Sequence, residues 1–287
     1  MLRLAVATDA ETYERMQASL RERSIDAEYV RTAERTVPLS DPPWDAFDVG
    51  FVFPPRLMEG GVADALLDVP WVNDREAILR SRNKADTLAR LSSAGLPTAE
   101  TVMVSNPADE GDLVAAYERL DPPVVVKPNS TTRGVGVAKA ADLDSFLGVV
   151  DYLDLVHDFR ATGDKSFLVQ EYLPGATDYR AMVLDGEYVG AVERRLPEEA
   201  LAAGQWKHNV HRGAVATRVD LDPGLRELAE RAAGALDIPF LGVDLLVTDD
   251  RAVVNETNAR PTIDDADKYE AGFWDDLAAM IRETADA

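Results

Sequence analysis

Two acidic residues near the C-terminus stand in otherwise apolar, strand-like segments. Asp244 lies inside "FLGVDLLV", and Glu256 and Asn258 lie in "AVVNETN". If the segments form a hairpin in which Thr248 faces Ala252, then Asp244 faces Glu256. Facing residues project to the same side of a sheet, and Asn258, two residues beyond Glu256, projects to that side as well. Ionised carboxylates are costly to bury unpaired, so these oxygen donors predict a Mg²⁺ site, with Mn²⁺ as an alternative.

A solvated strand face is the competing interpretation, because the chain contains 52 acidic residues. The apolar neighbours of Asp244 and the matched positions in the two segments favour the metal site.

A glycine-rich segment, "VVVKPNSTTRGVGV", joins two predicted strands. Gly134 and Gly136 let backbone N–H groups approach an anion, and Lys127 places an ammonium group beside them. The segment lacks the G-x-x-x-x-G-K-[ST] pattern of a P-loop, and most such turns are only turns. A Mg²⁺ site and a phosphate-binding turn in one chain together predict a nucleoside triphosphate.

Basic residues concentrate in "ERRLPEEALAAGQWKHNVHRG", residues 193–213. Guanidinium groups bind carboxylates bidentately, so this segment predicts a site for carboxylate substrates. The residues expected to bind them are Arg194, Arg195, Lys207, Arg212 and Arg260, with Arg195 beside the tetrahedral oxyanion. The alternative is that these arginines pair with glutamates of the same segment. We do not expect His208 and His211 to bind metal, because no cysteine lies nearby.

The elements that must position these residues fall into three predicted domains. Alternating strand and helix patterns predict a parallel α/β domain over 1–78. Residues 79–171 form a central unit of helices and strands, and 172–287 form a strand-rich unit that carries the metal site. In the central unit, Ser81 is predicted to cap a helix that ends near Gly95.

The third unit has clear turn and helix signals. A hairpin turns over Asp185-Gly186, and the stretch 196–213 is predicted to be a loop. A helix begins at Asp222-Pro223 and runs to about Leu236. The last helix is predicted to bury one apolar face that carries Phe273, Leu277 and Ile281.

The order of these motifs is similar to that of the ATP-grasp superfamily, and it most resembles the RimK-type α-L-glutamate ligases. The motifs are "SRNK", "VVVKPNSTTRGVGV", "LVQEYLPGATDYRAMVLDG", "GVDLL" and "VNETN". "QWKHNVHRG" is similar to the R-x-N-x-x-R-G loop of that family. The resemblance spans nearly the whole chain and is strongest from about 70 to 258. It implies an α+β ATP-grasp fold, in which an N-terminal α/β (pre-ATP-grasp) domain precedes two α+β subdomains that enclose the nucleotide.

The resemblance also implies roles for individual residues. Lys84, Lys127 and Asn209 would lie at the ATP phosphates. Backbone groups of the hinge Gln170, Glu171, Tyr172 and Leu173 would bind adenine, and the side chains of Glu171 and Asp178 would hold the nucleoside. Two Mg²⁺ ions would be held by Asp244, Glu256 and Asn258, and Arg180 would lie on the acceptor side.

The implied reaction is that of an ATP- and Mg²⁺-dependent carboxylate–amine ligase. A substrate carboxylate attacks the γ-phosphorus, an acylphosphate forms, and an amine displaces phosphate. Such chemistry depends on positioning and charge neutralisation, so no protein nucleophile is needed. The resemblance implies glutamate as the incoming amino acid and an acidic acceptor. A homo-oligomer, either dimer or tetramer, is expected because it is common among such ligases.

Two departures from the family pattern keep alternatives open. The chain continues as "NARPTIDDADKYEAGF" where RimK-type enzymes usually have Ser-Pro-Gly, and Lys207-His208 stands in place of an Arg-Ser pair. An Asn-x-Arg-Pro ending is typical of other ATP-grasp ligases, so a ligase that joins other amino acids is the first alternative. A catalytically silent ATP-binding module is the second, although all three metal ligands and both phosphate lysines are present.

Composition narrows the class of protein further. The 287 residues include 46% hydrophobic residues and no cysteine, which excludes disulfides and thiolate metal sites. The sequence shows no apolar run near the roughly 20 residues of a membrane span and no signal-peptide pattern, so a soluble, cytoplasmic protein is expected. A net charge of −22 disfavours nucleic acid and anionic membranes as partners.

The acidic residues are spread through ordered-looking sequence, which suggests adaptation to a salt-rich cytoplasm, as in halophiles. Because salt screens repulsion between surface charges, we expect the melting temperature to rise steeply with KCl concentration. Circular dichroism melts in a KCl series measure this. A melting temperature that stays constant from low to molar KCl would contradict the hypothesis.

Overall fold

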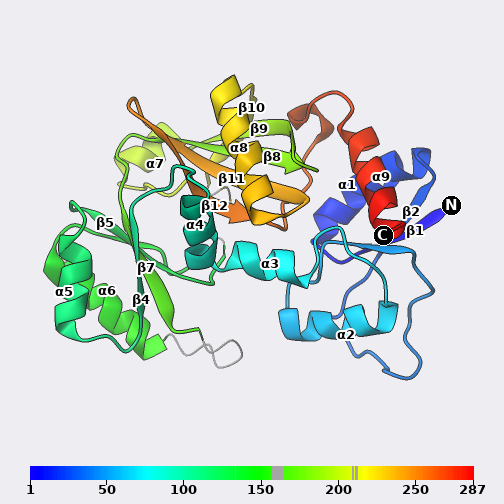
Figure 1. Cartoon of the computed structure of the whole chain (residues 1–287), viewed down its shortest axis with the longest axis horizontal. Coiled ribbons are helices and arrows are strands. Elements are labelled where there is room, and N and C mark those ends of the chain that lie inside the picture. The colour runs from blue at the N-terminus through cyan, green and yellow to red at the C-terminus, as the bar shows by residue number, and fades with distance from the viewer. Residues whose placement is uncertain (133, 157–163, 209, 211–212) are drawn as a thin grey trace.

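Three β-sheets organise the computed structural model (Figure 1). The described residues are 1–132, 134–156, 164–208, 210 and 213–287. Figure 1 shows the two termini close together at one end of the molecule and the four-stranded sheet at the opposite end. Among the described residues, no helix is long and apolar enough to cross a membrane.

The N-terminal sheet is parallel, with strand order β2-β1-β3. Its strands are β1 (Leu2–Val6), β2 (Ile25–Tyr29) and β3 (Val49–Phe51), with helices α1 (Ala10–Glu22) and α2 (Leu57–Leu67) between and after them. Helix α9 (Phe273–Ala285), from the other end of the chain, contacts both α1 and β3. The predicted parallel α/β arrangement is therefore present, and the predicted apolar face of the last helix is buried.

The central sheet is antiparallel, with strand order β4-β7-β5-β6. Its strands are β4 (Thr101–Ser105), β5 (Val124–Pro128), β6 (Ala138–Ala140) and β7 (Ser166–Glu171). Helices α5 (Glu110–Glu118) and α6 (Leu143–Val156) accompany it and share a core with it, in which Phe146 and Phe167 are fully buried. This core is separate from the larger hydrophobic core of the molecule.

The third sheet is antiparallel, with strand order β10-β9-β8-β11-β12. Its strands are β8 (Thr177–Leu184), β9 (Glu187–Arg195), β10 (Val215–Val219), β11 (Phe240–Val247) and β12 (Ala252–Asn258). Helix α8 (Pro223–Leu236) packs on it and begins at Pro223, as predicted. The predicted hairpin turn is also present, because Asp185 and Gly186 both have positive φ, at 48° and 82°.

The start of the central segment differs from the prediction. An unpredicted helix, α3 (Arg75–Arg82), precedes α4 (Lys84–Ser93), and the side chain of Asn83 caps α4 by accepting from the Asp86 backbone N–H at 3.1 Å. Ser81 is therefore not the cap. Its hydroxyl is buried 3.0 Å from the Thr257 hydroxyl and accepts from the Ala259 backbone N–H, which fixes α3 to the end of β12.

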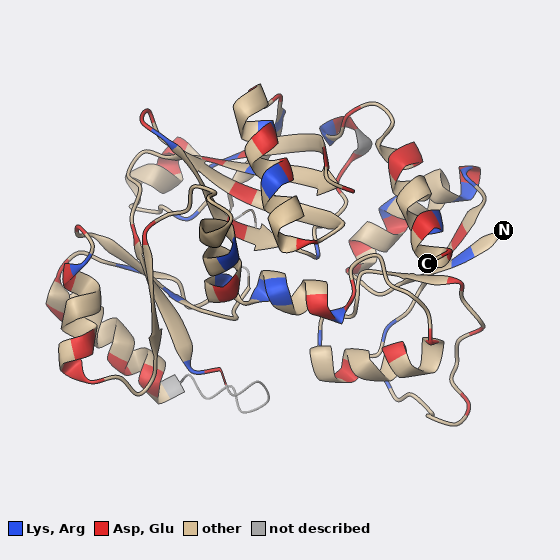
Figure 2. Cartoon of the chain, viewed as in Figure 1, with Lys and Arg blue, Asp and Glu red and all other residues tan. Residues whose placement is uncertain are grey.

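The structure also differs from the predicted loop at 196–213 and from the predicted domain boundary at residue 79. The stretch predicted as a loop contains the short helix α7 (Glu198–Ala202), and β10 follows it as an edge strand. The predicted boundary at residue 79 falls inside α3, which packs on the third sheet together with α4. The division into three domains stays a prediction. Figure 2 shows acidic residues distributed over all three sheet regions rather than collected in one tail.

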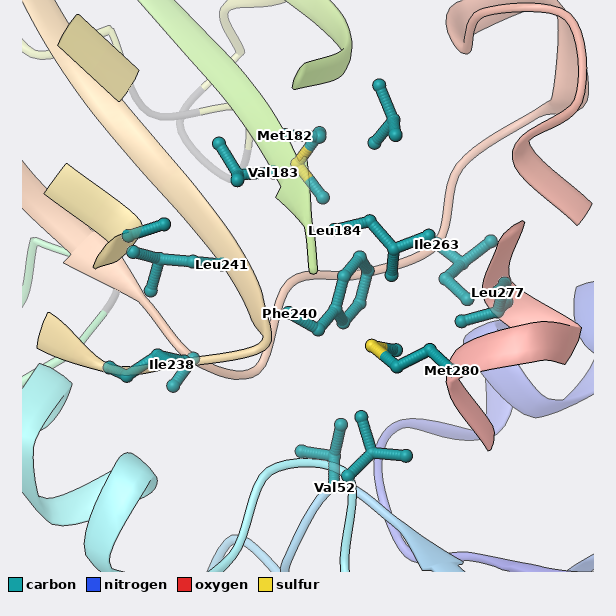
Figure 3. Packing of buried hydrophobic residues seen from close by; sticks show 14 of the residues in the cluster. Val52, Met182, Val183, Leu184, Ile238, Phe240, Leu241, Ile263, Leu277 and Met280 are labelled. Atoms are coloured by element: carbon teal, nitrogen blue, oxygen red, sulfur yellow. The ribbon is translucent and has the colours of Figure 1, made fainter. Parts of the chain in front are cut away.

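The N-terminal sheet and the third sheet share one hydrophobic core (Figure 3). Fully buried Phe240, at the start of β11, lies among Leu184, Ile263 and Met280, with Val52 of the N-terminal unit nearby. Asn73 ties this junction together: its amide nitrogen donates to the Phe240 and Ala259 carbonyls at 2.6 and 2.7 Å, and its oxygen accepts from the Phe240 N–H.

We expect Asn73→Ala to lower the free energy of unfolding by about 3 kcal/mol or more, because it leaves buried backbone groups without partners. Urea denaturation followed by circular dichroism measures this. Gln205→Ala, which truncates an exposed amide, is the control and should change stability by less than about 0.5 kcal/mol. Equal stability of the two variants would show that Asn73 does not hold the junction.

Candidate active site

The hairpin of β11 and β12 brings the predicted metal ligands together. Asp244 pairs with Glu256, and Gly242 pairs with Asn258, so all three oxygen-bearing side chains belong to one face of the sheet. The predicted turn register is wrong, because Ala252 faces Val247 rather than Thr248. A β-bulge at Asn255 adds one residue to β12, which offsets the one-residue error and places Asp244 opposite Glu256 as predicted.

Charged side chains run across this face of the sheet, and arginines alternate with aspartates up to Asp244. Arg194 on β9 faces Asp178 on β8, and Arg180, two residues after Asp178, faces Asp244 on β11. Together with Glu256 on β12 they make a row that crosses four strands. We call Arg194, Asp178, Arg180, Asp244 and Glu256 the charged row.

Ion pairs connect the members of the charged row. Arg180 donates to both carboxylate oxygens of Asp244, at 2.7 and 2.9 Å, and Arg194 approaches the same carboxylate at 3.0 Å. Arg194 also donates to Asp178 at 2.9 Å. Burial raises the pKa of the Asp244 carboxyl, but Arg180 and Arg194 outweigh it and hold that pKa well below its usual value. Burial raises the pKa of Asp178.

Two lysines reach the end of the row from other elements. Lys84, the first residue of α4, lies 3.2 Å from the Glu256 carboxylate. Lys127, on β5 of the central sheet, donates to the Asn255 side chain at 3.4 Å. Both side chains are at least 94% buried. Burial lowers the pKa of Lys127 to about 8, with the charge of Glu256 acting against burial and that of Lys84 adding to it.

The glycine-rich turn lies beside these lysines. Gly134 and Gly136 have φ of 66° and 76°, and a Cβ at Gly136 would lie 2.8 Å from Pro128, so both positions suit glycine. Lys84 donates to the Thr131 carbonyl in the turn, and Lys207 donates to the Val137 carbonyl. The turn is thereby joined both to α4 and to the segment that contains Lys207.

The predicted hinge comprises the last two residues of β7 and the two residues after it. The Glu171 carboxylate accepts from the Glu100 N–H at 2.7 Å and pairs with Arg251 at 2.5 Å, while Leu173 is partly buried. The Tyr172 ring meets Trp206 edge-on at 5.9 Å, and the Lys139 ammonium lies 4.5 Å from the Tyr172 ring centre. Asp178, expected at the nucleoside, pairs with Arg194 in the charged row.

The structure changes the picture of the arginine-rich segment. Arg195, the predicted oxyanion cation, projects to the opposite face of β9, is 76% exposed and pairs with Glu193. Its neighbour Arg194 lies in the site instead. His208 lies 3.9 Å from Asp178, and burial lowers its pKa. The predicted residues Asn209, His211 and Arg212 lie outside the described residues.

Arg260 lies at the junction with the N-terminal unit. It donates to the Phe53 carbonyl, and burial lowers its pKa to about 10, with Asp9 raising it and Arg82 lowering it. Arg82, which was not predicted, reaches the carbonyls of Pro55 at 3.5 Å and of Ser130 at 3.3 Å. Its position two residues before Lys84 was the available signal, since α3 and α4 lead into the site together.

A divalent metal fits the chemistry of the donors, which are two carboxylates and an amide on adjacent strands. The described residues contain no group of three or more His, Cys, Asp or Glu able to hold a metal, so Asn258 would have to be the third ligand. Its side-chain oxygen accepts from the Arg260 backbone N–H at 2.9 Å.

Comparison with known proteins identifies the family. The family model described as RimK-like ATP-grasp domain matches residues 81–281, and the chain therefore belongs to that family, as predicted. It is 33% identical to the ribosomal protein bS6–L-glutamate ligase of Shigella boydii over 199 residues, which is 69% of this chain and 62% of that relative. The chain thus spans less than two thirds of that relative's length.

Solved structures confirm the predicted α+β ATP-grasp fold. A RimK domain ATP-grasp protein from Sphaerobacter thermophilus superposes with a TM-score of 0.68, at 22% identity and over 99% of this chain and all of that one. The D-alanine–D-alanine ligase from Bacillus anthracis complexed with ATP superposes with a TM-score of 0.69, at 17% identity, over 99% of this chain and 97% of that one.

The lowered pKa of Lys127 predicts how anion binding depends on pH. The free ammonium loses its proton above pH 8, whereas a bound phosphate keeps it protonated, so affinity falls as pH rises. Between pH 7.5 and 9 we expect the affinity for a non-hydrolysable ATP analogue to fall by up to about tenfold. Calorimetric titration of the chain and of Lys127→Met measures this, and the variant should lose the pH dependence.

Lys165→Met removes an exposed lysine and serves as the control, which should retain the pH dependence. A decline with pH that persists in Lys127→Met would assign the titration to another group.

Proposed function

We propose that this chain is an ATP-dependent carboxylate–amine ligase that forms amide bonds through an acylphosphate. One observation carries the proposal: Lys84, Lys127, Asp244 and Glu256 converge from α4, β5, β11 and β12. Two buried ammonium groups beside two carboxylates match a triphosphate whose charge is shared with divalent metal. The family of the chain supports this, since the relative from Shigella boydii carries the name of a glutamate ligase.

The residues divide the work of the reaction between them. Lys84, Lys127 and the turn with Gly134 and Gly136 would neutralise and orient the phosphates, and the hinge at Tyr172 would bind the base. Asp244, Glu256 and Asn258 would hold two Mg²⁺, with Mn²⁺ as a substitute. When bound, these ions would polarise the transferred phosphoryl group.

The chemistry needs no covalent intermediate with the protein. A carboxylate oxygen of one substrate attacks the γ-phosphorus, and ADP leaves. The amine nitrogen of the second substrate then attacks the acyl carbon, and phosphate and a proton leave. What the chain must supply is alignment of the three reactants and cancellation of negative charge.

We place an anionic substrate group at the junction of the N-terminal unit and the phosphate turn. Arg260 and Arg82 both lie there, and Asp9 is close enough to shift the pKa of Arg260. Arg260 donates to the Phe53 carbonyl, and Val52 comes directly before Phe53. Val52 has φ of 59°, a left-handed conformation that costs a β-branched residue about 1–3 kcal/mol and is typical of ligand sites. An amino acid fits this junction, because its carboxylate can bind the two arginines while its ammonium group binds Asp9.

Lys207 and Tyr172 close the other side of the nucleotide. Lys207 reaches from the segment after β9 to the Val137 carbonyl, and Trp206 beside it contacts Tyr172. We therefore propose that Lys207 acts on the phosphate turn, rather than on a substrate carboxylate. Glutamate as the incoming amino acid and an acidic acceptor remain our assignment, since the arginines suit anionic substrates.

The test is mass spectrometry of a cell extract incubated with the chain, ATP, MgCl₂ and isotope-labelled glutamate. We expect one species to gain a labelled glutamyl residue as ADP appears. Asp244→Asn should reduce ADP release by at least about a hundredfold, because charge neutralisation acts mainly on the transition state. Asp249→Asn, in the exposed turn of the same hairpin, is the matched control and should leave the rate unchanged.

The outcomes separate the candidate functions. Labelling by lysine, alanine or another amino acid in place of glutamate would reject glutamate and retain the ligase. Binding of ATP without ADP release from any amino acid or extract would favour a catalytically silent module.

A further inference from the structure

Arginines contact both oxygens of the Asp244 carboxylate. Arg180 donates to each of its two oxygens, and Arg194 lies 3.0 Å from one of them. The Asp244 side chain is only 8% exposed. A divalent cation that binds Asp244 meets two guanidinium groups on the same carboxylate, and it must tolerate or displace the positive charge of at least one of them.

The two arginines are held very differently. Arg194 is 7% exposed and has a second carboxylate partner in Asp178, at 2.9 Å. Arg180 is 30% exposed, and among the described residues its only ion-pair partner is Asp244. Loss of Asp244 to a cation leaves Arg194 paired with Asp178, but it leaves Arg180 without an ion-pair partner among the described residues.

The side chain of Arg180 passes close to a glycine on the same face of the sheet. Gly242 stands between Met182 and Asn258 in the pairing, two residues before Asp244, so no side chain rises from β11 at that point. A Cβ placed there would lie in van der Waals contact with Pro261 Cβ at 3.5 Å, the Asn258 carbonyl at 3.6 Å and Arg180 Cδ at 3.7 Å. A freed Arg180 therefore remains on the face that carries Glu256 and Asn258, where the phosphoryl group and the substrates would meet.

We propose that Arg180 is an exchangeable counter-ion, which neutralises Asp244 until a divalent cation takes that carboxylate and then binds a carboxylate of the incoming amino acid. The proposal rests on the proposed function and adds a coupling to it. Binding of the metal nucleotide frees the guanidinium group that the substrate carboxylate needs. Because such coupling is reciprocal, the substrate must in turn tighten metal nucleotide binding. Arg194 is a positioning residue that stays with Asp178.

The experiment measures binding rather than turnover. The full chain is titrated with Mn²⁺ in the presence of a non-hydrolysable ATP analogue, with and without glutamate, and free Mn²⁺ is followed by electron paramagnetic resonance. In the unmodified chain we expect glutamate to raise Mn²⁺ affinity at least about fivefold. In Arg180→Met we expect Mn²⁺ to bind at least about fivefold more tightly without glutamate, because the competing cation is gone, and glutamate to have no further effect.

Matched variants control for general effects of charge. Arg218→Met removes an exposed arginine from β10 of the same sheet and should reproduce the unmodified chain. Arg180→Lys keeps one positive charge without the bidentate geometry, and it should recover part of the coupling. Melting curves of each variant establish that it is folded.

Weaker or unchanged Mn²⁺ binding in Arg180→Met would overturn the proposal, because a competing counter-ion can only strengthen metal binding when it is removed. Glutamate coupling that survives in Arg180→Met would overturn it as well. Failure of the proposed function looks different: the chain would bind Mn²⁺ and the ATP analogue, yet no amino acid would alter that binding or cause ADP release.

Discussion

The alternation of side chains along β8, β9, β11 and β12 decides which charges share the site, and two β-bulges set that alternation. A shift of one residue moves every following side chain to the other face of a sheet. In β12 the bulge at Asn255 changes the register between Leu245 and Asp244, so that Asp244 faces Glu256. In β9 the bulge at Val189 changes it between Val183 and Met182. Without these two residues the charged row would not exist.

The groups released by the bulges find partners, which explains how such irregularities persist. The Val189 carbonyl accepts from the Glu270 N–H at 2.8 Å, and the Asn255 side chain accepts from Lys127. Gly190, next to the bulge at Val189, has φ of 145°, and a Cβ there would lie 2.5 Å from the Lys268 carbonyl. The bulge at Val189 thus contacts the segment that leads to α9, and the bulge at Asn255 contacts buried Lys127.

Much of the fold and part of the site could be predicted from the sequence. The Asp185-Gly186 turn, the buried strands and the Asp222-Pro223 helix start are local signals, and the structure confirms them. The Asp244–Glu256 pair was predicted from a regular hairpin, and it is present because the bulge offsets an error of one residue in the turn.

The errors have the same physical origin, which is that bulges and tertiary contacts leave little trace in local sequence. A regular β8–β9 hairpin would place Arg195 on the face of Asp178, but the Val189 bulge places Arg194 there. Serine is a residue type that often caps helices, yet the Ser81 hydroxyl hydrogen-bonds with Thr257 and Ala259, which lie more than 170 residues away in the sequence.

The net charge of −22 likewise does not predict the charges of the candidate site. At a Debye length of about 8 Å, distant acids are screened, whereas buried Lys84, Lys127 and Arg194 act at contact distance in a low dielectric. An acidic chain can therefore contain a locally positive site, because nearby charges, and not the net charge, determine the electrostatic potential there.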